Sequence, residues 1–197
     1  MASCILIGPP GCGKGTQRER LVKKYGFATI VPGDLMREEI KNKTSIGLQL
    51  EDCLSKGLLA PHELAMHVVE KKLTEYNETG VKHILFDGFP REIEQAVAID
   101  KSLHDICKDK FNIKCAILFE VSDDTAIKRI YGRSLYSGRA DDSNDDVIHT
   151  RLKLYHEKIV HVVDKYRKQC ILHVVDGEPS IDIVATALDH IINNIFA

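Results

Sequence analysis

A glycine-rich stretch at residues 8–16 contains the residue types that bind phosphate groups. It reads Gly-Pro-Pro-Gly-Cys-Gly-Lys-Gly-Thr, follows an apolar run at residues 4–7 and precedes a helical pattern. Glycines let backbone N–H groups approach an anion closely, and a helix N-terminus adds unpaired N–H groups and the positive end of the macrodipole. Lys14 supplies a mobile positive charge for the outer phosphates. The spacing predicts a phosphate-binding loop.

Arginines outside this loop indicate more than one phosphate-bearing ligand. Arg129 and Arg133 lie four residues apart on one predicted helix, where like charges repel by roughly 0.2–0.5 kcal/mol. A simple nucleotide hydrolase needs about one arginine at the transferring phosphate. The chain offers six candidates, at Arg37, Arg91, Arg129, Arg133, Arg139 and Arg151. Each alone is compatible with a solvent-exposed arginine, but together they favour two phosphate-bearing ligands that face each other.

Asp87 is the candidate for orienting a metal ion. It ends a buried apolar run at residues 84–86 and precedes Gly88, which would admit a ligand close to the backbone. In phosphate-loop enzymes, an aspartate at the end of a strand beside the loop orients Mg²⁺. Capping of the next helix is the alternative.

Alternating short apolar runs and longer helical patterns must position these residues. We expect strands at residues 4–8, 28–31, 83–87, 115–121 and 171–176, and helices at 14–25, 61–77, 91–106, 123–133, 145–169 and 180–196. This alternation predicts a doubly wound α/β fold with a parallel sheet and ligands at the carboxyl ends of its strands. Two segments interrupt this alternation. We expect residues 33–57 to form short helices and residues 134–146 to form a short, mobile, polar loop between two helices.

Bulk composition excludes several classes of protein. The 197 residues carry a net charge of −2, which gives no case for binding nucleic acid. No apolar run approaches the ~20 residues that span a bilayer, and the chain enters its first strand too early for a signal peptide. The six cysteines form no Cys-x-x-Cys pair, which argues against structural zinc and a disulfide framework. We expect a cytoplasmic protein.

The motifs taken together resemble those of the nucleoside monophosphate kinases, most closely the short adenylate kinases, over essentially the whole chain. The phosphate loop departs from the general pattern, since Gly15 precedes the hydroxyl of Thr16, and this ending is similar to the loop of that family. The other matching segments are residues 33–37, 56–61, 87–91 and 137–142.

The resemblance implies a phosphate-loop NTPase-type three-layer α/β/α fold with a five-stranded parallel sheet. It implies one domain, 1–197, with a core (1–31, 58–133 and 147–197), a helical monophosphate-binding flap (32–57) and a short lid (134–146). The short lid contains no cysteine, so the zinc-binding lid of some family members is excluded. A monomer is expected.

The resemblance also implies a reaction, the reversible transfer of the γ-phosphoryl group of ATP, bound with Mg²⁺, to AMP. It assigns ATP binding to Gly11, Cys12, Gly13, Lys14, Gly15, Thr16, Arg129, Arg133 and Pro179. It assigns AMP binding to Pro32, Gly33, Arg37, Leu58, Leu59, Ala60, Gly88, Phe89, Pro90, Arg91, Gln95, Arg139 and Arg151. Catalytic roles fall to Lys14, Arg91, Arg129, Arg133, Arg139 and Arg151, and a water-mediated magnesium contact to Asp87.

Few residues indicate which base the acceptor nucleotide carries. Gln95 offers a donor and an acceptor that suit adenine, whereas the similar position in uridylate and cytidylate kinases carries Asn. Pro32 stands where adenylate kinases usually have Thr or Ser, and it lacks both a hydroxyl and an N–H. Pro179, near the donor adenine, leaves the choice between ATP and GTP loose. A pyrimidine monophosphate kinase and a non-catalytic nucleotide-binding module remain the alternatives.

Overall fold

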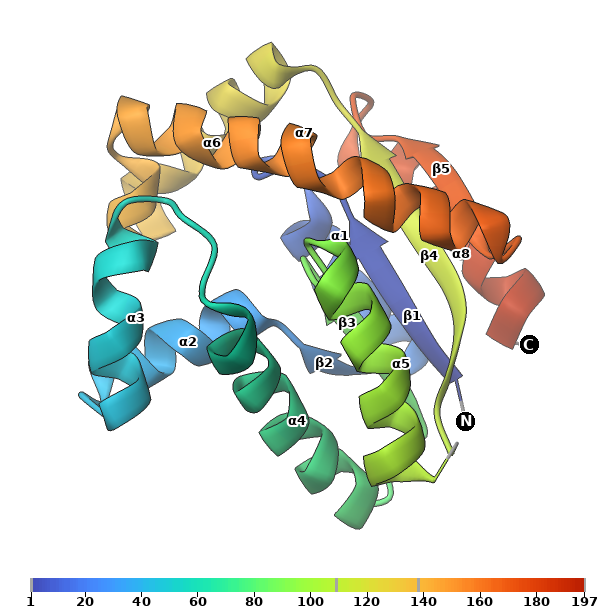
Figure 1. Ribbon diagram of the computed structural model, residues 1–197. Coiled ribbons are helices and arrows are strands. Elements are labelled where there is room, and N and C mark those ends of the chain that lie inside the picture. Colours follow the sequence, from blue (N-terminus) through green and yellow to red (C-terminus); the bar gives the residue numbers. More distant parts are fainter. Residues whose placement is uncertain (1, 109, 138, 197) are drawn as a thin grey trace.

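Five parallel strands form one sheet in the computed structural model, which describes residues 2–108, 110–137 and 139–196 (Figure 1). The strands are β1 (Ala2–Ile7), β2 (Ala28–Ile30), β3 (His83–Asp87), β4 (Asn112–Glu120) and β5 (Leu172–Asp176). Their spatial order is β2-β3-β1-β4-β5. Leu6 of β1 lies opposite Asp87 of β3, so the phosphate loop and the aspartate leave the sheet at the same edge. All five expected strands are confirmed, although β1 and β4 begin two and three residues earlier than predicted.

Helices connect the strands and form the inserted segments. They are α1 (Lys14–Tyr25), α2 (Pro32–Lys41), α3 (Ser45–Ser55), α4 (His62–Glu78), α5 (Ile93–Cys107), α6 (Asp123–Ser137), α7 (Asp145–Lys168) and α8 (Ile181–Phe196). The left-handed Gly26 ends α1 as expected. In the described part of the chain, no helix has both the length and the apolar character required to cross a membrane.

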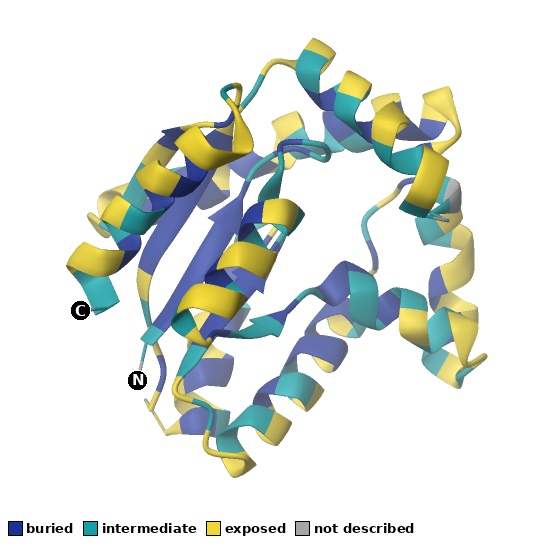
Figure 2. Ribbon diagram, turned by 180° about the vertical axis from the view of Figure 1, so that it is seen from behind, coloured by how far each residue is buried: buried dark blue, intermediate teal, exposed yellow. Residues whose placement is uncertain are grey.

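Helices cover both faces of the sheet, because neighbouring residues of each strand point to opposite sides. Ile5 of β1 packs in a core with residues of α4, α5 and α7, whereas Leu6 packs in a second core with residues of α1 and α8. Both side chains are fully buried, and Figure 2 shows buried strands between helices whose outer surfaces are exposed. The three-layer α/β/α architecture is confirmed.

The polar segment at residues 134–146 is more regular than expected. Helix α6 continues to Ser137 instead of ending at residue 133, and a 3₁₀ turn, Ala140–Asp142, precedes α7. No proline or glycine interrupts residues 133–137, so the helix has no reason to stop earlier. The prediction of a loop from residue 134 was wrong for residues 134–137, and Gly138 of the lid motif lies outside the described residues. Residues 33–57 do form short helices, α2 and α3.

A glycine allows the two flap helices to pack closely. A Cβ added to Gly47 of α3 would collide with the backbone carbonyl of Glu39 in α2. We expect Gly47→Ala to lower the free energy of unfolding by about 1–3 kcal/mol, even though alanine favours helices, because overpacking separates α2 from α3. Urea denaturation measures the change. Gly132→Ala on α6 is the matched control, because no atom lies within 4 Å of its added Cβ. Equal stability changes in both variants would contradict the prediction.

Candidate active site

A cavity of about 760 Å³ opens at the carboxyl ends of the strands. Its walls are the phosphate loop, the start of α2, the end of β3, one face of α6 and the N-terminal half of α7. The predicted residues that line it are Gly11, Cys12, Gly13, Lys14, Gly15, Thr16, Gly33, Arg37, Leu59, Asp87, Gly88, Pro90, Arg91, Arg129, Arg133, Arg139, Arg151 and Pro179. The fold therefore brings all six predicted arginines to one cavity.

The phosphate loop presents Lys14 at the base of this cavity. Gly13, the N-cap residue of α1, has a φ of 97°, a conformation that side chains disfavour, and no side chain caps the first N–H groups of this helix. The Lys14 ammonium donates hydrogen bonds to the carbonyl oxygens of Gly8 (2.6 Å) and Pro9 (3.0 Å). It also lies 3.2 Å from the Cys12 sulfur, whose side chain is buried behind the loop. Carbonyl oxygens of the loop itself therefore solvate the lysine.

Arg37 and Arg91 converge beside the start of α2. A Cβ built on Gly33 would lie 3.3 Å from an Arg37 nitrogen and 3.7 Å from an Arg91 nitrogen. Desolvation, followed by the charges of Arg151 and Arg37, lowers the pKa of Arg91 to about 10. Arg91 nevertheless stays protonated at neutral pH. The repulsion within this cluster would be relieved by an anion such as a phosphate.

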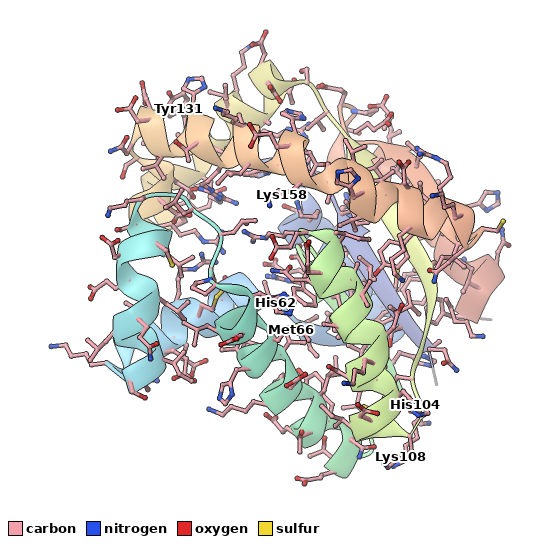
Figure 3. The ribbon with its side chains drawn as sticks, in the orientation of Figure 1. His62, Met66, His104, Lys108, Tyr131 and Lys158 are labelled. Atoms are coloured by element: carbon pink, nitrogen blue, oxygen red, sulfur yellow. The ribbon has the colours of Figure 1, made fainter. Side chains whose placement is uncertain are left out.

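Asp142, in the lid segment (134–146), holds Arg133 of α6 and Arg151 of α7 in place. Asp142 is fully buried and accepts hydrogen bonds from Arg133 (2.7 and 2.8 Å) and Arg151 (2.9 Å). Desolvation alone would raise the pKa of Asp142, but the hydrogen bonds and charges of the two arginines outweigh it and lower the pKa. Tyr131, labelled in Figure 3, donates to Asp145 (2.8 Å) and joins α6 to the start of α7.

Asp34 links the flap to the lid. It accepts hydrogen bonds from Arg37 (2.5 Å) on its own helix and from Arg139 (2.9 Å) beyond α6. Desolvation would raise the pKa of Asp34, yet the hydrogen bond and charge of Arg37, helped by Arg139 and Arg18, lower it. Arg139 thus contacts both sides of the cavity, because it follows α6 and pairs with α2.

Arg129 lines the cavity between the phosphate loop and the loop after β5. Its guanidinium donates to the carbonyl oxygens of Gly177 (2.8 Å) and Glu178 (3.1 Å). Pro179, the next residue, lines the same part of the cavity. Arg129 and Pro179 therefore border one pocket next to the phosphate loop.

Five predicted acceptor-site residues do not line the cavity, and their assignment stays a prediction. Gln95 is buried; its Oε1 accepts from the Arg91 backbone N–H (2.9 Å), and its Nε2 donates to Glu92 (3.3 Å). The carboxamide thus orders the turn that carries Arg91. The others are Pro32, which begins α2, the buried Ala60 and Phe89, and the exposed Leu58.

The reasoning from sequence missed further residues that line the cavity, among them Arg18, Tyr136 and Tyr155. Arg18 lies four residues after Lys14, Tyr155 four after Arg151, and Tyr136 seven after Arg129. Helical periodicity was the available signal, since residues at these spacings share a helix face. Burial raises the pKa of Tyr155, so its hydroxyl stays neutral.

Arg18 pairs with the predicted metal-orienting residue. Its Nη1 lies 3.0 Å from a carboxylate oxygen of Asp87 and 3.5 Å from one of Asp34. Among the described residues, no group of three or more His, Cys, Asp or Glu side chains can hold a metal ion. One carboxylate and the nearby Thr16 hydroxyl fit Mg²⁺ that is held mainly by phosphates and water.

A substitution of Asp142 tests how Arg133 and Arg151 are held in place. We expect Asp142→Asn to lower the free energy of unfolding by about 2 kcal/mol, because two charge-assisted pairs are lost. The lowered pKa means that this stabilisation is present at neutral pH and is lost as the pH falls. The stabilities of the two proteins should therefore begin to converge as the pH falls below about 3.9, where the unfolded-state aspartate takes up a proton, and should meet only below the lowered pKa of Asp142 in the folded protein. Urea denaturation at several pH values measures both effects, and a pH-independent difference would contradict this account.

Comparison with known proteins identifies similar sequences over nearly the whole chain. The family described as "Adenylate kinase" matches residues 6–171. An "Adenylate kinase" of Prochlorococcus marinus (strain NATL1A) is 40% identical over 187 residues, which covers 94% of this chain and 95% of that protein. An "Adenylate kinase" of Flavobacterium psychrophilum is 34% identical over 195 residues, or 99% of this chain and 100% of that protein.

Proposed function

The chain belongs to the adenylate kinase family, and we propose that the arginine-lined cavity is where it transfers the γ-phosphoryl group of ATP to AMP. The chain is thus a phosphotransferase. One observation carries the placement of the reaction: a phosphate loop and two separate groups of arginines meet in a single cavity. A hydrolase would need only one such group.

The donor half consists of the phosphate loop and the facing side of α6. Lys14 and the loop N–H groups would hold the β- and γ-phosphates, and the phosphate oxygens would replace the carbonyl oxygens of Gly8 and Pro9 around the ammonium. Arg133 would reach the transferring phosphoryl group. Arg129 and Pro179 would border the ATP base, because they lie side by side in the cavity.

The acceptor half is formed by Arg37 and Arg91, whose guanidinium groups converge beside Gly33. They would hold the acceptor phosphate, whose oxygen is already anionic and needs no side-chain base to attack. Arg139 and Arg151 would contact both substrates and stabilise the charge that spreads over the equatorial oxygens in the transition state. The bond from the γ-phosphorus to ADP breaks as the bond to the AMP oxygen forms, which gives two ADP.

Magnesium would reach this site with ATP and neutralise negative charge on the phosphate oxygens. Asp87 would orient its water ligands, and the Thr16 hydroxyl would lie beside it. Closure of the flap (32–57) and lid (134–146) over the core would exclude water, which otherwise accepts the phosphoryl group. The direct pair between Arg139 and Asp34 supports such a closure, since it joins the two segments.

An assay with a panel of acceptors tests this proposal. The protein is incubated with MgATP and AMP, CMP, UMP or GMP, and formation of diphosphates is followed by coupled ADP detection. We expect AMP to give the highest kcat/KM. Preference for UMP or CMP would support a pyrimidine monophosphate kinase instead, and no turnover with any acceptor would leave a nucleotide-binding module.

Two further experiments test the other parts of the proposal. Light scattering would test whether the protein is a monomer, and cell fractionation would test whether it is cytoplasmic.

A further inference from the structure

Arg18 is the one guanidinium group of the cavity that the phosphotransfer reaction, as proposed, does not use. It lies on α1 one turn after Lys14, lines the cavity, and has a side chain that is only 19% exposed. Its Nη1 is within 3.0 Å of Asp87 at the end of β3 and within 3.5 Å of Asp34 in the flap. One cation thus contacts a carboxylate of the core and a carboxylate of the flap.

The two carboxylates differ in what else surrounds them. Asp34 also accepts hydrogen bonds from Arg37 (2.5 Å) and Arg139 (2.9 Å) and would stay paired without Arg18. Asp87 has a side chain that is 8% exposed, and its hydrogen-bonded ion pair is with Arg18 at 3.0 Å. A nearly buried carboxylate needs a cation, since burial of an unpaired charge is strongly unfavourable. Arg18 supplies that cation.

We propose that Arg18 is a positioning residue that serves as an exchangeable counter-ion for Asp87 and thereby sets how strongly Mg²⁺ assists ATP binding. This rests on the proposed function, in which Asp87 orients the metal. Asp87 must exchange the Arg18 cation for a hydrated divalent one, and the two cations compete for the same carboxylate. Arg18 can give up Asp87 at low cost, because the Asp34 carboxylate lies 3.5 Å from the same nitrogen. Arg18 therefore reduces the extent to which Mg²⁺ strengthens ATP binding. When Arg18 leaves Asp87, its contact with Asp34 in the flap becomes stronger.

Isothermal titration calorimetry provides a readout that does not depend on turnover. The Kd of ATP is measured without AMP, once with EDTA and once with excess Mg²⁺, and the ratio of the two values reports how far Mg²⁺ assists binding. We expect this ratio to rise about tenfold in Arg18→Met, because an adjacent arginine lowers the proton affinity of a carboxylate by about tenfold or more and would compete in the same way with a divalent cation. Arg18→Lys keeps the charge and should retain the wild-type ratio.

Arg20→Met is the matched control, since Arg20 lies on the same helix, is exposed and pairs only with the exposed Asp182 among the ion pairs of the described residues. It should leave the ratio unchanged. In an Asp87→Asn background, adding Arg18→Met should alter the ratio less than twofold, because the effect acts through Asp87.

An unchanged or lowered ratio in Arg18→Met would overturn the inference, as would an equal rise in Arg20→Met. If Arg18→Met does not fold, Arg18→Gln takes its place with the same expected result. If the wild-type protein phosphorylates AMP but the variants leave the ratio unchanged, only the role of Arg18 is rejected. A wild-type protein that phosphorylates no acceptor rejects the proposed function.

Discussion

Arg91→Ala is expected to lower kcat/KM for AMP by about 10³-fold while it leaves the Kd of ATP unchanged. The effect is of the size seen when an arginine is lost from a phosphoryl-transfer site. Desolvation, followed by the charges of Arg151 and Arg37, lowers the pKa of Arg91 to about 10. An acceptor phosphate would relieve that repulsion, so the loss of one member removes binding energy specifically from the acceptor half.

Steady-state kinetics with varied AMP and calorimetry with ATP measure the two effects separately. Arg167→Ala is the control, because Arg167 lies on the exposed surface of α7 and pairs with Asp164 three residues before it. The assignment of Arg91 to the acceptor would be refuted if its loss weakened ATP binding as much as AMP use.

Lys14→Met should lower kcat by about 10²–10³-fold, with a smaller change in the KM for ATP. A group that meets charge developing on the transferring phosphate contributes more to the transition state than to the ground state. The ammonium donates to the carbonyl oxygens of Gly8 and Pro9. It can exchange these acceptors for phosphate oxygens without crossing the cavity.

Single-turnover kinetics separates the chemical step from product release, and thermal unfolding shows whether the loop remains intact. Lys24→Met is the matched control, since Lys24 lies on the same helix but pairs with Asp189 on α8. A Lys14→Met protein with wild-type kcat and only a raised KM would place the lysine in ground-state binding alone.

Local patterns in the sequence predicted most of the fold. The alternation of apolar and helical segments was sufficient for the five parallel strands and the helices between them, because burial on both faces of a parallel sheet requires near-continuous apolar strands. Helix ends were less predictable. The extension of α6 to Ser137 was missed, although the absence of proline and glycine from residues 133–137 was an available local signal.

The cavity itself was also predictable in its main parts. The phosphate loop is a local feature, in which spacing alone places Gly13 and Lys14 at a helix start. Parallel strands then bring Asp87 and Arg91 to the same edge of the sheet. Gln95 shows the limit of such reasoning, because a polar side chain suited to a base can equally satisfy its neighbours, here the Arg91 N–H and Glu92.

The sequence by itself determined the fold class, the phosphate loop and the set of arginines available for two phosphate-bearing ligands. Only the tertiary structure decided which partners hold those charges. Arg18 meets Asp87 across 69 positions of the chain, and Arg139 meets Asp34 across 105. The reason is physical: the choice of ion-pair partner depends on the distance and desolvation of side chains from separate elements, and these quantities exist only once the elements have packed.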